Sequence, residues 1–122
     1  MNNSTLEGYV KDLLIDEIES AKDWINLSEY KDNWYDLAFK LLESYNVDGT
    51  ITYNTYKSEE ILKNHYSEVG EYIEEIQDNW CIEVKPFQEP EKALVQIVLY
   101  IADNLNIEIN DDTTWEDIKE QL

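Results

Sequence analysis

Residues 93–102 read Ala93-Leu94-Val95-Gln96-Ile97-Val98-Leu99-Tyr100-Ile101-Ala102. Only Gln96 and Tyr100 carry a polar group in this run, so a helix formed by it would be apolar on nearly every side. Such a helix belongs in the centre of a bundle, where other helices cover it. Pro90 suits the first turn of this helix, because proline has a helical φ and lacks only an N–H that has no partner there. We therefore predict a buried helix over about 91–105.

Apolar residues at helical spacing predict three helices before this one, over about 6–27, 28–45 and 58–79. Ser4 or Thr5 can cap the first of them, since both side chains accept hydrogen bonds from a helix N-terminus. The residues expected to face the core are Leu6, Val10, Leu13, Leu14, Ile18, Ala21, Ile25, Trp34, Leu37, Ala38, Leu41, Leu42, Ile61, Leu62, Val69, Ile73 and Ile76.

Thr113-Thr114-Trp115-Glu116 has the pattern of a capping box and predicts a C-terminal helix. Asn46-Val47-Asp48-Gly49 is the clearest turn signal. Segments 50–53, 81–84 and 107–109 leave room for a small β element. We predict one mainly α domain over residues 1–122, a compact helical bundle around the 91–105 helix.

The chain of 122 residues carries 28 acidic and 9 basic side chains, so its net charge is −19, while 43% of its residues are hydrophobic. All basic residues are lysines, and the acidic residues are spread along the whole chain. This balance argues against direct binding to nucleic acid or to an anionic membrane, because both require basic patches. Cys81 has no second cysteine with which to form a disulfide.

Few residues could carry catalysis or hold a metal. His65 is the only histidine, and Ser67, two residues along the same predicted helix, would point away from it. We expect His65 to pack at the edge of an apolar stripe and Cys81 to be a small buried side chain. Asp48-Gly49 and the segment 106–111 lack the full ligand pattern of a calcium loop. We predict no catalytic residue, no metal site, no cofactor and no enzymatic activity.

Acidic residues recur at steps of three and four on two predicted helices. The first stripe is Asp12, Asp16, Glu19 and Asp23, and the second is Glu60, Glu68, Glu71, Glu75 and Asp78, with Asn64 between. Like charges at these spacings cost roughly 0.2–0.5 kcal/mol per pair, so helix stability does not explain them. They are either ordinary solvated faces or a binding surface. Successive carboxylates rise about 4.5–6 Å along a helix, against about 3.4 Å between phosphates of one DNA strand.

The stripes therefore suggest a partner with a groove of lysines and arginines that normally holds DNA or RNA. Charges at a rim give little affinity by themselves, so such a surface needs buried anchors. Tyr72 lies within the second stripe and Tyr66 lies near it, and we expect these two side chains to serve as anchors.

Three segments carry a resemblance: Asp48-Gly49-Thr50-Ile51-Thr52-Tyr53, Ser58-Glu59-Glu60-Ile61-Leu62 and Pro86-Phe87-x-x-Pro90-Glu91. Together, over about 48–105, they resemble small acidic proteins of phages and mobile elements from AT-rich bacteria. That resemblance implies an anti-CRISPR or antirestriction inhibitor, which occupies the nucleic-acid groove of a Cas effector or restriction nuclease. It also implies the cytoplasm of a bacterial host, and nothing at the N-terminus matches a secretory signal.

Two other functions remain open. An acidic helical adaptor or assembly protein would show an exposed apolar patch and would bind its partner at high salt. An immunity protein for a cationic nuclease toxin would use the same charge as an inhibitor but would be paired with a toxin gene. The sequence does not predict an oligomeric state.

Overall fold

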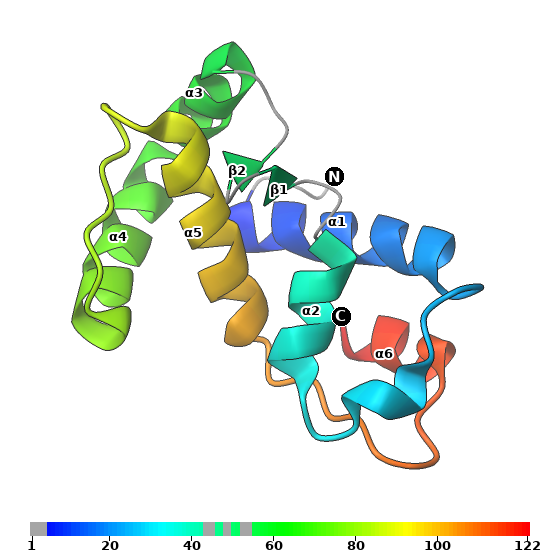
Figure 1. Cartoon of the computed structure of the whole chain (residues 1–122). Coiled ribbons are helices and arrows are strands. Elements are labelled where there is room, and N and C mark those ends of the chain that lie inside the picture. The colour runs from blue at the N-terminus through cyan, green and yellow to red at the C-terminus, as the bar shows by residue number, and fades with distance from the viewer. Residues whose placement is uncertain (1–4, 43–45, 48–49, 52–54) are drawn as a thin grey trace.

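The computed structural model describes residues 5–42, 46–47, 50–51 and 55–122, and it is mainly helical (Figure 1). The helices are α1 (Leu6–Ala21), the short 3-10 helix η1 (Leu27–Tyr30), α2 (Trp34–Leu42), α3 (Thr55–Asn64), α4 (Tyr66–Trp80), α5 (Pro90–Asp103) and α6 (Trp115–Gln121). The strands β1 (Asn46–Val47) and β2 (Thr50–Ile51) form an antiparallel pair, with Asn46 opposite Ile51. The predicted mainly α fold is confirmed. None of the described helices is both long and apolar enough to cross a membrane.

Helix α5 lies at the centre, as predicted, and it contacts α1, α2, α3, α4 and β2 (Figure 1). Pro90 is at its N-terminal turn. The buried residues cover most of the circumference of this helix: Ala93, Leu94, Val95, Ile97, Val98, Tyr100, Ile101 and Ala102. The remaining face carries Lys92, Gln96, Leu99 and Asp103, which are exposed or half-buried. The core therefore forms where the surrounding helices each turn their apolar stripe toward α5.

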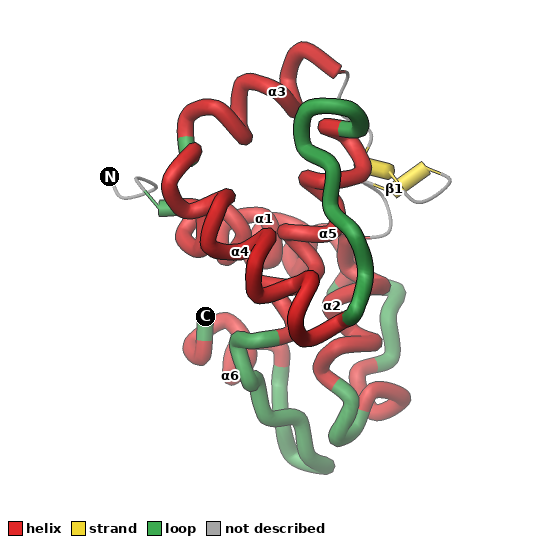
Figure 2. Tube along the Cα trace, turned by 90° about the vertical axis from the view of Figure 1, so that its left-hand side faces the viewer, coloured by secondary structure: helices red, strands yellow, loops and turns green. Residues whose placement is uncertain are grey.

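The predicted core residues of the surrounding helices are buried, except that Ile73 is half-buried. Helix α6 packs against α1, with Ile118 fully buried. The loop that follows α4 runs back alongside it toward α5 (Figure 2). The predicted helix end at 43–45 and the predicted turn residues Asp48 and Gly49 lie outside the described residues.

The first two helices are shorter than predicted, and local hydrogen bonding explains the difference. Helix α1 ends at Ala21 instead of about residue 27, and the Asn26 side chain then accepts from the Ser28 N–H at 3.2 Å to begin η1. Helix α2 begins at Trp34 and not at residue 28. Asp32, just before it, has a left-handed φ of 61°, which no residue inside a right-handed helix can adopt.

The predicted helix over 58–79 is in fact two helices, α3 and α4, with a break at His65. His65 has φ −120° and ψ 36°, and its Nδ1 lies 3.1 Å from Oε1 of Glu68. Asn64 and His65 are weak helix formers, and a local side-chain contact of this kind competes with a continuous helix. The second acidic stripe is therefore divided between two helices.

Residues 81–84 do not form a strand. Cys81 ends α4 in a left-handed conformation, with φ 57°, and its side chain is exposed, so the prediction of a buried cysteine was wrong. The Val84 N–H donates to the side-chain oxygen of Gln77 at 3.2 Å and not to a neighbouring strand. Of the predicted segment 50–53, Thr50–Ile51 is a strand, and the other two positions lie outside the described residues.

Residues 107–109 are also not a strand, although Ile107 and Ile109 are buried in alternation. The Gln121 side chain accepts from the Glu108 N–H at 2.9 Å and donates to the Glu108 carbonyl at 3.1 Å. One side-chain amide thus takes the place of a partner strand.

The capping box of the last helix lies one residue later than predicted. The Thr114 side chain accepts from the Asp117 N–H at 3.2 Å, and the Asp117 carboxylate accepts from the Thr114 N–H at 3.0 Å. The motif type was therefore correct and its register was wrong.

The central position of α5 predicts a difference between two truncations in that helix. Ile97 is fully buried and Leu99 is half-buried. Ile97→Ala should lower the free energy of unfolding by about 2–5 kcal/mol, because it leaves a cavity in the core, and Leu99→Ala should cost clearly less. Urea denaturation followed by circular dichroism measures both. Equal losses would contradict a helix that turns Ile97 toward the core and leaves Leu99 partly open to solvent.

Candidate functional site

Helix α4 concentrates negative charge. It carries five carboxylates, Glu68, Glu71, Glu74, Glu75 and Asp78, and no basic residue. Glu68 is half-buried, and the other four side chains are exposed. Because α4 packs on α5 and α3 with its apolar side, its opposite side is an acidic face directed toward solvent.

Glu68 is a structural residue as well as a charged one. Its two carboxylate oxygens accept from the Leu6 N–H at 3.2 and 3.0 Å. This N–H belongs to the first turn of α1, where backbone donors have no partner within the helix. The carboxylate therefore caps α1 from a distant helix, and it also holds His65 at the start of α4.

Glu75 also serves the fold. Its Oε1 accepts from the hydroxyl of Tyr100 at 2.9 Å, and the same hydroxyl accepts from the Asn79 side chain at 2.8 Å. Tyr100 is 4% exposed and needs a partner for its hydroxyl group. Within the described residues, Glu71, Glu74 and Asp78 show no comparable hydrogen bond or ion pair. These three are the carboxylates of α4 that are available to a partner.

Tyr72 lies among these carboxylates and is half-buried. Its ring packs edge-on against Tyr100, with 6.4 Å between the ring centroids. Burial raises the pKa of its hydroxyl above the usual value, and the nearby charges of Glu7, Glu68, Glu75 and Glu71 add to this rise. Glu7 comes from the first turn of α1, so both helices supply charge around this ring.

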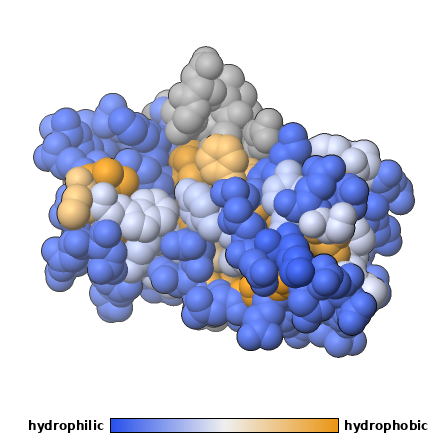
Figure 3. Space-filling view, turned by 60° about the horizontal axis from the view of Figure 1, so that its bottom comes forward, coloured by the Kyte–Doolittle hydropathy of each residue, from blue (hydrophilic) through white to orange (hydrophobic). Residues whose placement is uncertain are grey.

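Tyr72 is one end of a series of ring contacts that we call the aromatic row: Tyr72, Tyr100, Trp80, Tyr35 and Phe39. Successive ring centroids lie 5.3–6.5 Å apart. At the other end, burial raises the pKa of Tyr35, and the charges of Asp103 and Asp36 contribute. Figure 3 shows a face of the molecule that is mainly hydrophilic, with separate apolar patches between the hydrophilic residues.

The stripe predicted on α1 is only partly available. Asp12 and Asp16 are exposed along the helix, and Asp23 is exposed in the turn after its end. Glu19 pairs with Lys22 at 3.1 Å and with Lys119 of α6. Hydrogen bonds from Lys119 and then Lys22 lower the pKa of Glu19, so this carboxylate joins α1 to α6.

The structure thus brings together only part of the predicted site. Tyr72 on α4 has three carboxylates of the same helix nearby, from Glu68, Glu71 and Glu75. Asp78 lies about one turn beyond Glu75. Glu60 is exposed on α3, on the other side of the break at His65. The proximity of Glu7 and Tyr100 to Tyr72 could not be predicted from the sequence, because it depends on how α1 and α5 pack against α4.

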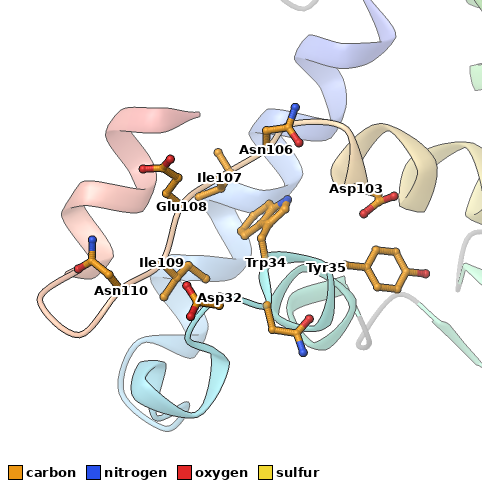
Figure 4. A pocket seen from close by; sticks show the side chains of 10 residues that line it. Asp32, Trp34, Tyr35, Asp103, Asn106, Ile107, Glu108, Ile109 and Asn110 are labelled. Atoms are coloured by element: carbon orange, nitrogen blue, oxygen red, sulfur yellow. The ribbon is translucent and has the colours of Figure 1, made fainter.

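A polar pocket of 470 Å³ opens between α2 and the loop after α5. Figure 4 shows Trp34 at its centre with Asp32, Asp103 and Glu108 around it. The indole N–H of Trp34 donates to the Ala102 carbonyl at 2.6 Å, which holds the ring in place. In the part of the chain that the structure describes, no three His, Cys, Asp or Glu side chains are grouped so that they could hold a metal ion.

An apolar groove of 800 Å³ lies beside α4, between α3, α4 and the turn at 85–88. Its edge includes Tyr66 and Phe87, which are 70% and 86% exposed. Tyr66, predicted from the sequence as an anchor, thus lies at the edge of a groove that no sequence pattern indicated.

No family model matches this chain, and no curated protein and no solved structure was found to be similar to it.

Among the described residues, Glu68 has a structural role and Glu71 has none, so removing each carboxylate should change the free energy of unfolding by a different amount. Glu68→Ala should lower the free energy of unfolding by about 1–3 kcal/mol, because it removes the cap of α1 and leaves the buried Leu6 N–H without its partner. Glu71→Ala should change it by no more than about 0.5 kcal/mol, since this side chain is exposed. Urea denaturation of the two variants gives both values. A loss at Glu71 as large as that at Glu68 would show that the two carboxylates have the same structural role.

The raised pKa of Tyr72 predicts loss of stability in alkali. Above pH of about 10 the unfolded chain releases the phenol proton before the folded protein does, so the free energy of unfolding falls as the pH rises. Tyr72→Phe should make this fall shallower. Tyr66→Phe, at an exposed position, is the control. Thermal unfolding measured across alkaline pH tests the difference, and parallel curves for the two variants would exclude a contribution from Tyr72.

Proposed function

We propose that this protein is a stoichiometric inhibitor that binds the cationic DNA- or RNA-binding groove of a defence nuclease in the cytoplasm of a bacterial host. This is the anti-CRISPR or antirestriction type of function that the sequence resembles. The observation that carries the proposal is α4, a helix with five carboxylates and no basic residue, in a chain with net charge −19.

The spacing of the free carboxylates suits a groove built for phosphates. Glu71, Glu74 and Asp78 span about 10 Å of helix axis, a length over which one DNA strand carries about three phosphates. Long-range attraction would raise the rate at which these carboxylates associate with lysines and arginines. The affinity would fall as the salt concentration rises.

Tyr72 supports the same surface in a different way. Charged groups at the rim of an interface contribute little affinity, and aromatic side chains that become fully desolvated contribute most of it. Tyr72 is already half-buried against Tyr100 and surrounded by carboxylates, so an arginine of the partner could pack on the ring and pair with a carboxylate at once.

The decisive experiment reverses the charges that have no structural role. The variant Glu71→Lys, Glu74→Lys, Asp78→Lys leaves the cap at Glu68 and the hydrogen bond at Glu75 in place. The control variant Glu29→Lys, Asp112→Lys, Glu120→Lys changes the net charge equally at exposed positions elsewhere. Both are tested on a panel of purified Cas effectors and restriction nucleases, by target-DNA binding and cleavage.

The α4 variant should weaken inhibition of the responsive nuclease by about 100-fold or more, because like charges facing each other cost several kcal/mol. The control variant should inhibit nearly as well as the wild type. Equal loss in both variants would show that only the total charge matters. Full inhibition by the α4 variant would exclude α4 as the contact surface.

A second candidate function is an acidic adaptor, and the exposed apolar groove beside α4 favours it. An adaptor would bind its partner through apolar contacts that survive high salt, whereas an inhibitor that depends on α4 charge would be released. Measuring binding at rising salt concentration separates the two functions.

A further inference from the structure

The groove beside α4 has apolar walls and an exposed aromatic edge. Its apolar lining includes Leu62 from α3, Tyr66, Val69, Gly70 and Ile73 from α4, and Phe87 from the following turn. The Glu89 and Gln88 N–H groups donate to the Lys85 carbonyl at 2.8 and 3.2 Å, and this turn places Phe87 beside the groove. An aromatic side chain that is 86% exposed in an ordered turn has no role in the core.

The second observation is that a glycine, Gly70, lies in the lining of the groove. It lies in the middle of α4 and lines the groove, and glycine is a poor helix former at such a position. Apart from its chain neighbours and the nearby backbone of its own helix, no heavy atom of the described residues lies within 4 Å of the place where a Cβ would be, so their packing does not require glycine there. The missing side chain instead leaves the helix surface open to close approach by another chain.

We infer that this groove binds an amphipathic helix of a partner protein, with leucine-like side chains toward Gly70 and lysines or arginines at the edges. The described residues of the lining belong to helices and a turn, and none of them belongs to β1 or β2. An extended peptide would find no strand edge with which to pair its backbone. A helix satisfies its own backbone hydrogen bonds and can approach a glycine closely.

Charge decides between a foreign helix and a second copy of this chain. Glu59 lies in the lining, Glu74 is exposed one turn beyond Gly70, and Lys63 is the basic residue of the lining. With a net charge of −19, two copies would repel each other across this surface. A helix with basic edges is attracted to it.

This inference rests on the proposed function and deepens it, because the groove would supply a second apolar anchor in addition to Tyr72, yet it can be tested separately. The probe is a synthetic helical peptide with leucines at positions i, i+3, i+4 and i+7 and flanking lysines. The control peptides are a scrambled peptide of the same composition and the same helix with glutamates in place of lysines. Fluorescence anisotropy of labelled peptides measures binding to the full chain at low and high salt.

Gly70→Ala is the most discriminating variant. The added methyl group should raise the melting temperature by about 3–6 °C, since alanine favours the helix. It should also weaken binding of the amphipathic peptide by about tenfold or more, because it fills the floor of the groove. Phe87→Ser should weaken binding without lowering stability, and Ser20→Ala on exposed α1 is the control for both measurements.

The expected result is that the amphipathic lysine peptide binds more tightly than the glutamate and scrambled peptides, that raising the salt concentration weakens its binding without abolishing it, and that Gly70→Ala and Phe87→Ser reduce it. Equal binding of the scrambled peptide, no binding of any peptide, or no effect of either groove variant would overturn the inference. Sedimentation showing a dimer that Phe87→Ser dissociates would instead identify a second copy as the occupant and would also overturn it. If the peptide binds as expected but the α4 charge variant inhibits the nuclease as well as the wild type, the proposed function fails and the groove stands. If no peptide binds while only the α4 charge variant loses inhibition, the groove fails and the proposed function stands.

Discussion

Every other feature of this protein depends on the need to cover most of the surface of α5. A helix with apolar residues around most of its circumference is unfavourable in water, so α1, α2, α3 and α4 each turn an apolar stripe toward it. Once those stripes face inward, the polar faces have no position except the surface. The negative charge of the chain is thus displayed outward as a consequence of the core.

The fold uses some of that charge, and this use separates structural carboxylates from available ones. Glu68 caps α1, Glu75 satisfies the buried hydroxyl of Tyr100, and Glu19 pairs with Lys119 to join α1 to α6. Each of these contacts connects elements that are distant in the sequence. The exposed carboxylates Glu71 and Asp78 therefore remain as charge that the fold does not require.

Local patterns in the sequence were enough to predict the helices, the central position of the 91–105 segment and most core residues, because apolar periodicity records burial directly. They failed at two of the predicted strands. The Gln121 side chain pairs with the backbone of Glu108 in place of a partner strand, and the left-handed backbone of Cys81 ends α4 where a strand was predicted to begin. The acidic stripes were visible in the sequence. Which of their carboxylates serve the fold was not, since the Leu6 N–H lies 62 residues from Glu68.

The break at His65 explains why a groove lies beside the carboxylates of α4. If α3 and α4 formed one continuous helix, Leu62 and Ile73 would lie on the surface of one straight cylinder, which is convex along its whole length and has no groove. Because the chain turns at His65, α3 and α4 are separate walls, and the space between them becomes a groove. Glu68 contacts both His65 and the Leu6 N–H, so it fixes the turn relative to α1. A carboxylate that the sequence presents as one more charge in a stripe thus positions the groove beside the free carboxylates of α4.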